Sequence, residues 1–273
     1  MYRHRAGPIE AKALIFDSHC HLDPETYGGE PAVDEVIATA VAAGVTRMLT
    51  VGSGYGEGSA ERAVSVAKRH PGVVWAAVGL HPHDASMMTP SLLDSLVALA
   101  KNREVVAWGE MGLDFFYDNS PREVQRDVFR KQIRVALELD LPMIIHDRDS
   151  DWEAFAILKN EGAFERGRVL YHCYAGDLEQ LSELVSHGGW ISLPGVVTWK
   201  KSAMTKEVAK AVPVDKLLVE TDSPFLTPEP LRGRRNEPCH VALTVEEIAN
   251  LRGLHWSECA RATTQNANEL FGL

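Results

Sequence analysis

Eight short apolar runs, separated by amphipathic stretches, constrain the fold of this sequence more than any other feature. The runs predict strands at 13–21, 46–52, 73–80, 105–110, 141–146, 168–173, 190–194 and 216–222. The 3.6-residue periodicity predicts helices at 31–43, 57–69, 90–101, 121–139, 149–161, 177–187, 201–211, 240–251 and 256–270. Apolar strands that alternate with helices indicate a parallel sheet covered by helices. Eight such units in 273 residues predict an α/β fold of the (β/α)8 TIM-barrel type.

The length of the chain could hold two small domains, but no Pro/Gly/Ser-rich linker or low-complexity stretch divides it. We therefore expect a single barrel domain over 13–273, preceded by an N-terminal extension over 1–12. An open, doubly wound sheet is the competing arrangement. It is disfavoured because no G-x-G-x-x-G dinucleotide motif follows the first predicted strand.

The composition bears on the partners and the compartment of the protein. A formal net charge of −10 disfavours a protein that coats nucleic acid nonspecifically, although a local basic rim around an acidic pocket is still compatible with it. The four cysteines have no C-x-x-C spacing and are too few for a disulfide scaffold, which suits a reducing compartment. No signal-peptide core and no apolar run of membrane-spanning length are present. We expect a cytoplasmic protein that does not contact a membrane.

Five of the predicted strands end in side chains that can bind a metal ion. The first strand ends in His-x-His, and because alternate side chains of a strand share a face, two imidazoles there can converge on one ion. On its own this motif could be a pair of surface histidines. The recurrence of such groups at the ends of strands 4, 5, 6 and 8 favours a metal-dependent hydrolase, because the strand ends of a barrel meet at one mouth. The candidate metal ligands are His19, His21, Glu110, His146, His172 and Asp222.

Several ordered motifs resemble those of the TatD family of metal-dependent hydrolases, a branch of the amidohydrolase-like barrels. The similar segments are DSHCHLD at 17–23, GLHPH at 79–83, GEMGLD at 109–114, IHDR at 145–148, HCYAG at 172–176, ETDSP at 220–224 and RNEP at 235–238. They occur in family order and cover the chain from about residue 13 to the C-terminus.

The resemblance implies a binuclear metal centre. His19 and His21 would hold one ion together with Asp222, His146 and His172 would hold the second, and Glu110 would bridge the two. A metal pair polarises a phosphoryl or carbonyl oxygen and activates a water, so Asp222, as the proton acceptor, and Glu110 are the expected catalytic residues. The imidazole-rich ligand set favours two divalent ions of Zn²⁺, Mn²⁺, Fe²⁺ or Ni²⁺ over Mg²⁺.

Other residues near the strand ends are candidates for contacts with the substrate or with the ligands. His81 either contacts substrate or caps local structure, and Glu220 either orients a liganding histidine or forms a buried ion pair. Arg148 either clamps a phosphate or forms a salt bridge at the start of a helix. Arg232 and Arg235, in the loop after the last strand, could neutralise a nucleic-acid backbone, although exposed charges are commonly only solvated.

We expect a deoxyribonuclease that hydrolyses phosphodiester bonds at single-stranded ends, with DNA as substrate and no obligate protein partner. Phe115, Phe116, Tyr117 and Trp199 are candidates for stacking on bases. One alternative is an ester or amide hydrolase, such as a D-aminoacyl-tRNA deacylase or a small-molecule amidohydrolase, because an activated water attacks all of these substrates. The other alternative is a metal-binding barrel without catalysis, and the presence of all six ligand types argues against it.

Overall fold

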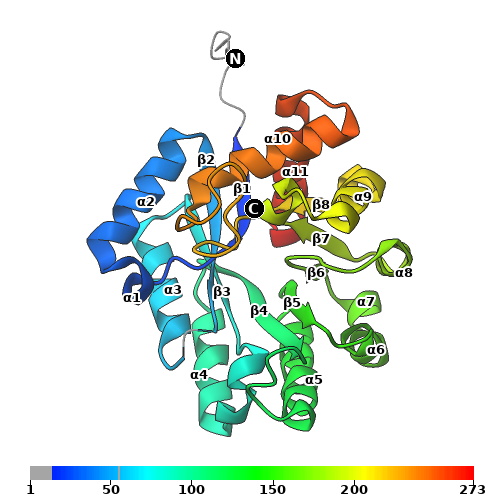
Figure 1. The fold of residues 1–273 in the computed structure, drawn as a ribbon. Coiled ribbons are helices and arrows are strands. Elements are labelled where there is room, and N and C mark those ends of the chain that lie inside the picture. The colour runs from blue at the N-terminus through cyan, green and yellow to red at the C-terminus, as the bar shows by residue number, and fades with distance from the viewer. Residues whose placement is uncertain (1–13, 55) are drawn as a thin grey trace.

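Eight parallel strands in sequence order form the centre of the molecule, as Figure 1 shows. The computed structural model describes residues 14–54 and 56–273, so the expected extension over 1–12 lies outside the described residues. The strands are β1 Ile15–Cys20, β2 Val45–Gly52, β3 Val74–Val78, β4 Val105–Asp114, β5 Met143–Arg148, β6 Val169–Tyr171, β7 Trp190–Leu193 and β8 Leu217–Val219. The predicted (β/α)8 barrel is confirmed.

Hydrogen bonds between the end of β1 and the segment after β8 join the two edges of the sheet. Cys20 and Ser223 form a parallel bridge, and the backbone N–H of His21 donates to the carbonyl oxygen of Ser223 at 2.8 Å. The backbone N–H of Asp222 donates to the carbonyl oxygen of His19 at 2.9 Å. These bonds bring Asp222 beside the two histidines that follow the first strand.

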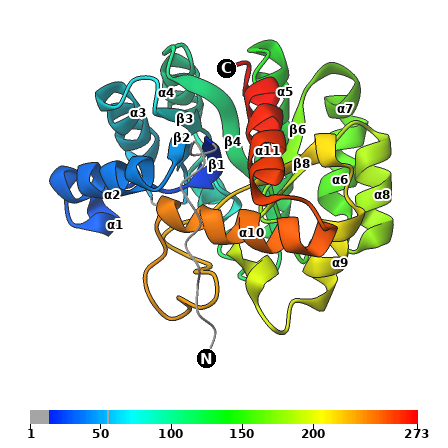
Figure 2. The ribbon, with the colours of Figure 1, turned by 90° about the horizontal axis from the view of Figure 1, so that it is seen from above.

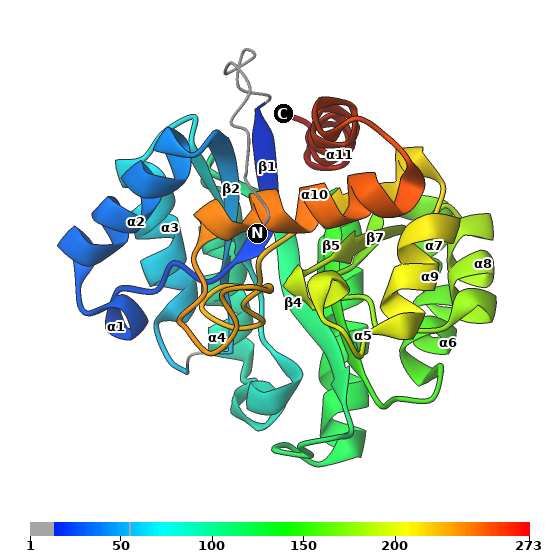
Figure 3. The ribbon, with the colours of Figure 1, turned by 45° about the horizontal axis from the view of Figure 1, so that its top comes forward.

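Helices surround the strands in every view of the molecule (Figures 1 and 3). The longer ones lie where periodicity predicts them: α2 Glu30–Ala42, α3 Ser59–Arg69, α4 Pro90–Ala100, α5 Arg122–Glu138, α6 Glu153–Asn160, α8 Leu178–Ser186, α9 Ala203–Ala211, α10 Val241–Arg252 and α11 Trp256–Phe271. Short helices that periodicity does not predict are α1 Pro24–Tyr27 and α7 Ala163–Arg166, with 3-10 turns η1 Pro82–Met87, η2 Gly195–Thr198, η3 Val214–Lys216 and η4 Pro238–His240. Within the described part of the chain, no helix has the length and apolarity needed to cross a membrane.

The two largest differences from the predicted boundaries have local backbone reasons. The helix expected from residue 149 begins only at Glu153, because Asp149, Asp151 and Trp152 have φ values of 56°, 51° and 69°, which a right-handed helix does not allow. Strand β4 continues to Asp114 rather than ending at Glu110. Glu110 therefore lies inside a strand and not at its end.

Two glycines allow β4 to press closely against β5 in this extended region. A Cβ on Gly109 would lie 2.6 Å from the carbonyl oxygen of Ile144, and a Cβ on Gly112 would lie 1.9 Å from that of His146. Their φ values of 142° and 150° also favour glycine. The register between the strands shifts between Trp108 and Met111, which places Glu110 at an irregularity of the ladder.

The barrel interior is filled by one apolar cluster at the end opposite the functional groups. Its fully buried members include Phe16, Leu49, Ala77, Ala107, Ile144, Leu170 and Leu218, one from each of seven strands. Helix α11 packs Leu270 and Phe271 against this cluster, with the rings of Phe16 and Phe271 5.7 Å apart. Figure 2 shows α11 lying along the strands and the loop between β8 and α10 projecting beside α10. The opposite, carboxyl ends of the strands carry the polar groups described next.

Candidate metal centre

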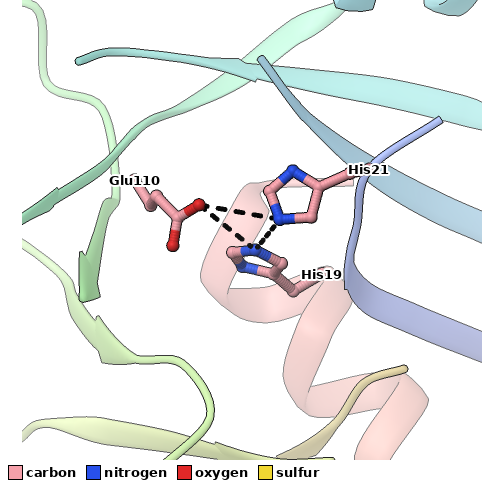
Figure 4. Close-up of side chains that lie close together, drawn as sticks. All are labelled: His19, His21 and Glu110. Carbon is pink, nitrogen blue, oxygen red and sulfur yellow. Dashed lines mark hydrogen bonds and ion pairs between the residues drawn. The ribbon is translucent and has the colours of Figure 1, made fainter. Parts of the chain in front are cut away.

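Two imidazoles from β1 and the residue after it converge at the mouth of the barrel (Figure 4). The Nε2 atoms of His19 and His21 lie 3.3 Å apart, and both side chains are buried. The Nδ1 of His21 lies 3.1 Å from the carbonyl oxygen of Val51, so it carries the proton and leaves Nε2 a lone pair. The Oδ1 of Asp222 lies 3.4 Å from the Nε2 of His21 and 3.8 Å from that of His19.

A second pair of imidazoles comes from β5 and the residue after β6. The Nδ1 of His146 and the Nε2 of His172 lie 3.3 Å apart. On the far side of each ring stands a carboxylate: Asp114 lies 3.1 Å from the Nε2 of His146, and Glu220 lies 3.7 Å from the Nδ1 of His172. Glu220 is fully buried and also accepts a hydrogen bond from the backbone N–H of Cys173 at 2.6 Å. It occupies the position from which a carboxylate can orient a liganding histidine.

The carboxylate of Glu110 stands between the two imidazole pairs. Its Oε1 lies 3.6 Å from the Nε2 of His21 and 3.9 Å from that of His19, and its Oε2 lies 2.7 Å from the Nε2 of His172 and 3.4 Å from the Nδ1 of His146. One oxygen thus faces each pair.

The charges of the cluster are balanced by neighbouring side chains, because most of its members are buried. Burial alone would raise the pKa of Glu110, but the imidazoles of His172 and His81 outweigh it and hold that pKa well below its usual value. Burial disfavours the charged form of His172. The nearby carboxylate of Glu110 outweighs burial, so the pKa of His172 is raised well above its usual value. Burial and its cationic neighbours hold the pKa of His19 well below normal, so its imidazole is neutral and able to act as a ligand.

The arrangement fits divalent metal ions. Two nitrogens bound to one tetrahedral ion at about 2.0–2.1 Å lie about 3.4 Å apart, which is close to the 3.3 Å separation in both imidazole pairs. In the described part of the chain, three sets of donor atoms each lie within 4.8 Å of one another, namely His19, His21 and Glu110; His19, His172 and Asp222; and His81, Glu110 and His146. All six residues predicted as ligands are brought together at one mouth.

The structure shows His81 in the capping role, while a contact with substrate stays a prediction. Its Nδ1 accepts a hydrogen bond from the backbone N–H of His83 at 3.1 Å and so caps η1. Its Nε2 lies 3.9 Å from the Oε2 of Glu110, and its ring lies 4.5 Å from that of His146. The same side chain therefore caps a turn and faces the cluster.

Two polar residues that were not predicted, Ser53 and Asp114, hold the cluster in place. Ser53 donates to the Oε1 of Glu110 at 3.3 Å and accepts from its backbone N–H at 3.2 Å. The Oδ2 of Asp114 lies 2.8 Å from the Nε2 of His83 and 3.1 Å from that of His146. Although burial opposes it, these imidazoles hold the pKa of Asp114 well below its usual value. The four-residue spacing between Glu110 and Asp114 would have indicated a shared strand face if β4 had been predicted to continue.

Of the three arginines predicted to contact substrate, one lines the pocket over the cluster and two do not. A pocket of about 540 Å³ opens over the cluster, and Arg148 lines it. Arg232 instead stacks on the ring of Trp199 at 4.1 Å, and Arg235 lies 4.7 Å from the ring of Tyr27. Neither is among the described residues that line the pocket, so any contact they make with substrate lies outside it.

A (β/α)8 barrel with buried histidine, glutamate and aspartate side chains converging at the carboxyl ends of its strands defines a metal-dependent hydrolase. The chain belongs to the family of TatD-related DNases, whose model matches residues 16–272. The resemblance noted from the ordered motifs is thereby confirmed.

Relatives of known sequence or structure match over nearly their whole length. The uncharacterised metal-dependent hydrolase YabD of Bacillus subtilis is 42% identical, over 94% of this chain and 99% of the relative. The 3'-5' ssDNA/RNA exonuclease TatD of Salmonella typhimurium is 37% identical, over 94% of this chain and 98% of the relative. The crystal structure of YJJV, a TatD homologue from Escherichia coli, superposes with a TM-score of 0.83 at 28% identity, covering 95% of this chain and 98% of that one.

Proposed function

We propose that this protein is a metal-dependent deoxyribonuclease that hydrolyses phosphodiester bonds of single-stranded DNA. The observation that carries the proposal is the position of Glu110, which has one oxygen facing each imidazole pair beneath an open pocket. The 37% identity to a protein named as an exonuclease of single-stranded DNA and RNA supports the choice of substrate.

We assign two divalent ions to the centre. His19, His21 and Asp222 would hold one ion, His146 and His172 the other, and Glu110 would contact both. Four imidazoles in the donor set favour Zn²⁺, Mn²⁺, Fe²⁺ or Ni²⁺ over Mg²⁺. When bound, such a pair polarises the phosphoryl oxygen and lowers the pKa of a water near it.

The residues of the chain have separate tasks in this mechanism. Asp222, which lines the pocket and is partly exposed, accepts the proton of the attacking water and returns it to the leaving oxygen. Asp114 and Glu220 fix the rings of His146 and His172 through the nitrogens that face away from Glu110. Arg148 at the pocket wall would bind the phosphate.

Arg232 and Arg235 would serve the rest of the strand. Both lie in the loop between β8 and α10 and outside the pocket, where they would contact backbone phosphates away from the scissile bond. With a net charge of −10, the chain needs such local positive charge to hold a polyanion.

We further propose that residues 13–273 form one barrel domain that works in the cytoplasm. All four cysteines of the sequence, Cys20, Cys173, Cys239 and Cys259, are free thiols, which supports a reducing compartment.

Hydrolysis by the metal-loaded protein should be fastest with single-stranded DNA. The test compares end-labelled single-stranded DNA, the same sequence as blunt duplex, a D-aminoacyl-tRNA and simple carboxylic esters at one metal concentration. We expect release of nucleotides from the single strand, slower release from the duplex, and loss of activity with a chelator. Faster turnover of the aminoacyl-tRNA or of an ester than of DNA would replace the proposed substrate with the alternative one.

A further inference from the structure

Exposed aromatic side chains are concentrated at the mouth of the metal centre. Among the described residues, the Phe, Tyr and Trp side chains that are more than half exposed are Phe116, Tyr117 and Phe225, at 55%, 54% and 52%. Tyr117 and Phe225 line the pocket over the cluster, and Phe116 packs against Tyr117 with the ring centroids 4.8 Å apart. Large apolar groups in water are unfavourable, so their collection at one functional opening indicates a binding role.

The backbone of Phe116 and Tyr117 is anchored to Asp114, and a guanidinium lies beside their rings. Their backbone N–H groups donate to the Oδ1 of Asp114 at 3.1 and 2.9 Å. The guanidinium of Arg148 lies 4.2 Å from the ring of Phe116 and 4.7 Å from that of Tyr117. A guanidinium that stacks by its face keeps its N–H edge available for a phosphate. Because Asp114 also bonds to His146, the backbone that carries the two rings is tied to the metal centre.

Phe225 lies beside the imidazole pair formed by His19 and His21. Its backbone N–H donates to the carbonyl oxygen of Asp222 at 2.9 Å, and its ring lies 6.3 Å from that of His21. Tyr117, by contrast, lies 5.4 Å from the ring of His83, on the side of Asp114 and His146. Each half of the cluster therefore has an aromatic ring beside it. The pocket between them, about 540 Å³, lies within the range of roughly 300–1,000 Å³ that is common for ligand sites.

We propose that Tyr117 and Phe225 form an aromatic clamp that stacks on unpaired nucleobases flanking the scissile phosphate, with Phe116 and Arg148 supporting Tyr117. A base within a duplex is already paired and stacked, so it must leave the helix before it can enter the clamp. The clamp thus gives the site its preference for single strands without reading the sequence, since every base offers a π-face. This inference rests on the proposed function and names the side chains that recognise the substrate.

If an aromatic side chain stacks on a base, removing either the side chain or the base should remove the same gain in kcat/KM. Tyr117→Ala and Phe225→Ala are assayed on a single-stranded oligonucleotide and on one whose last three nucleotides are abasic. Wild-type protein should favour the base-carrying substrate in kcat/KM, and each variant should reduce that preference about tenfold or more. Tyr117→Phe should retain it, and Met204→Ala, an exposed residue outside the pocket, is the matched control. An equal loss on both substrates, or no loss, overturns the clamp.

A binding measurement separates the clamp from the proposed function. Metal-loaded Asp222→Asn protein is mixed with an oligonucleotide carrying terminal 2-aminopurine, whose fluorescence falls when it stacks. The clamp is supported if the fluorescence is quenched by Asp222→Asn protein and this quenching disappears when Tyr117→Ala or Phe225→Ala is added. If that result is obtained but the wild type hydrolyses no DNA, only the proposed function fails. Hydrolysis of DNA with the same quenching in every variant leaves the function in place and overturns the clamp. Absence of both binding and hydrolysis overturns both.

Discussion

Glu110→Ala is expected to lose most of its bound metal. Glu110 is the carboxylate whose two oxygens face both imidazole pairs, at 2.7 Å from His172 and 3.6 Å from His21. Its removal deletes a ligand of each ion and leaves buried imidazoles without the negative charge that balances them. Elemental analysis after gel filtration should show up to two ions per chain in the wild type.

The matched control for this measurement is Glu61→Ala, which removes an exposed carboxylate from α3. It should keep the metal content of the wild type. If Glu110→Ala also keeps that content, the bridging position assigned to Glu110 is wrong, whatever happens to activity.

Asp222→Asn is expected to lower kcat by roughly 10²–10⁴-fold while changing substrate affinity and metal content far less. The amide oxygen can still face the Nε2 of His21, which lies 3.4 Å from the carboxylate in the wild type, but it cannot take up a proton. Steady-state kinetics on single-stranded DNA, together with metal analysis of the same sample, separate these effects.

Asp215→Asn, an exposed change in η3 just before β8, serves as the control for Asp222→Asn and should leave kcat as it is. Near-normal turnover by a metal-loaded Asp222→Asn protein would remove the proton-transfer role from this residue.

The fold was predictable because the apolar runs and the helical periodicity report directly on burial. The two largest errors at element ends arise from features of the backbone that periodicity does not encode. Gly109 and Gly112 would conventionally weaken a strand, yet here they permit close contact between β4 and β5, and so β4 continues to Asp114. The start of α6 is delayed because the backbone at Asp151 and Trp152 is left-handed, which the spacing of apolar residues does not indicate.

The six candidate ligands could be found because barrel topology places the ends of the strands together. Asp114 and Ser53 could not be found by the same rule, since their importance depends on hydrogen bonds to residues of other strands. The arginines of the β8–α10 loop illustrate the same limit. Their position after strand 8 was clear, but the stacking of Arg232 on Trp199 depends on how two loops pack.

Anomalous X-ray diffraction from crystals of the metal-loaded protein shows directly whether one buried cluster holds two metal ions that share Glu110. We expect two anomalous peaks at the mouth of the barrel. One should border His19, His21 and Asp222, the other should border His146 and His172, and both should contact Glu110. A single peak, or peaks away from these side chains, would show that Glu110 does not bridge two ions.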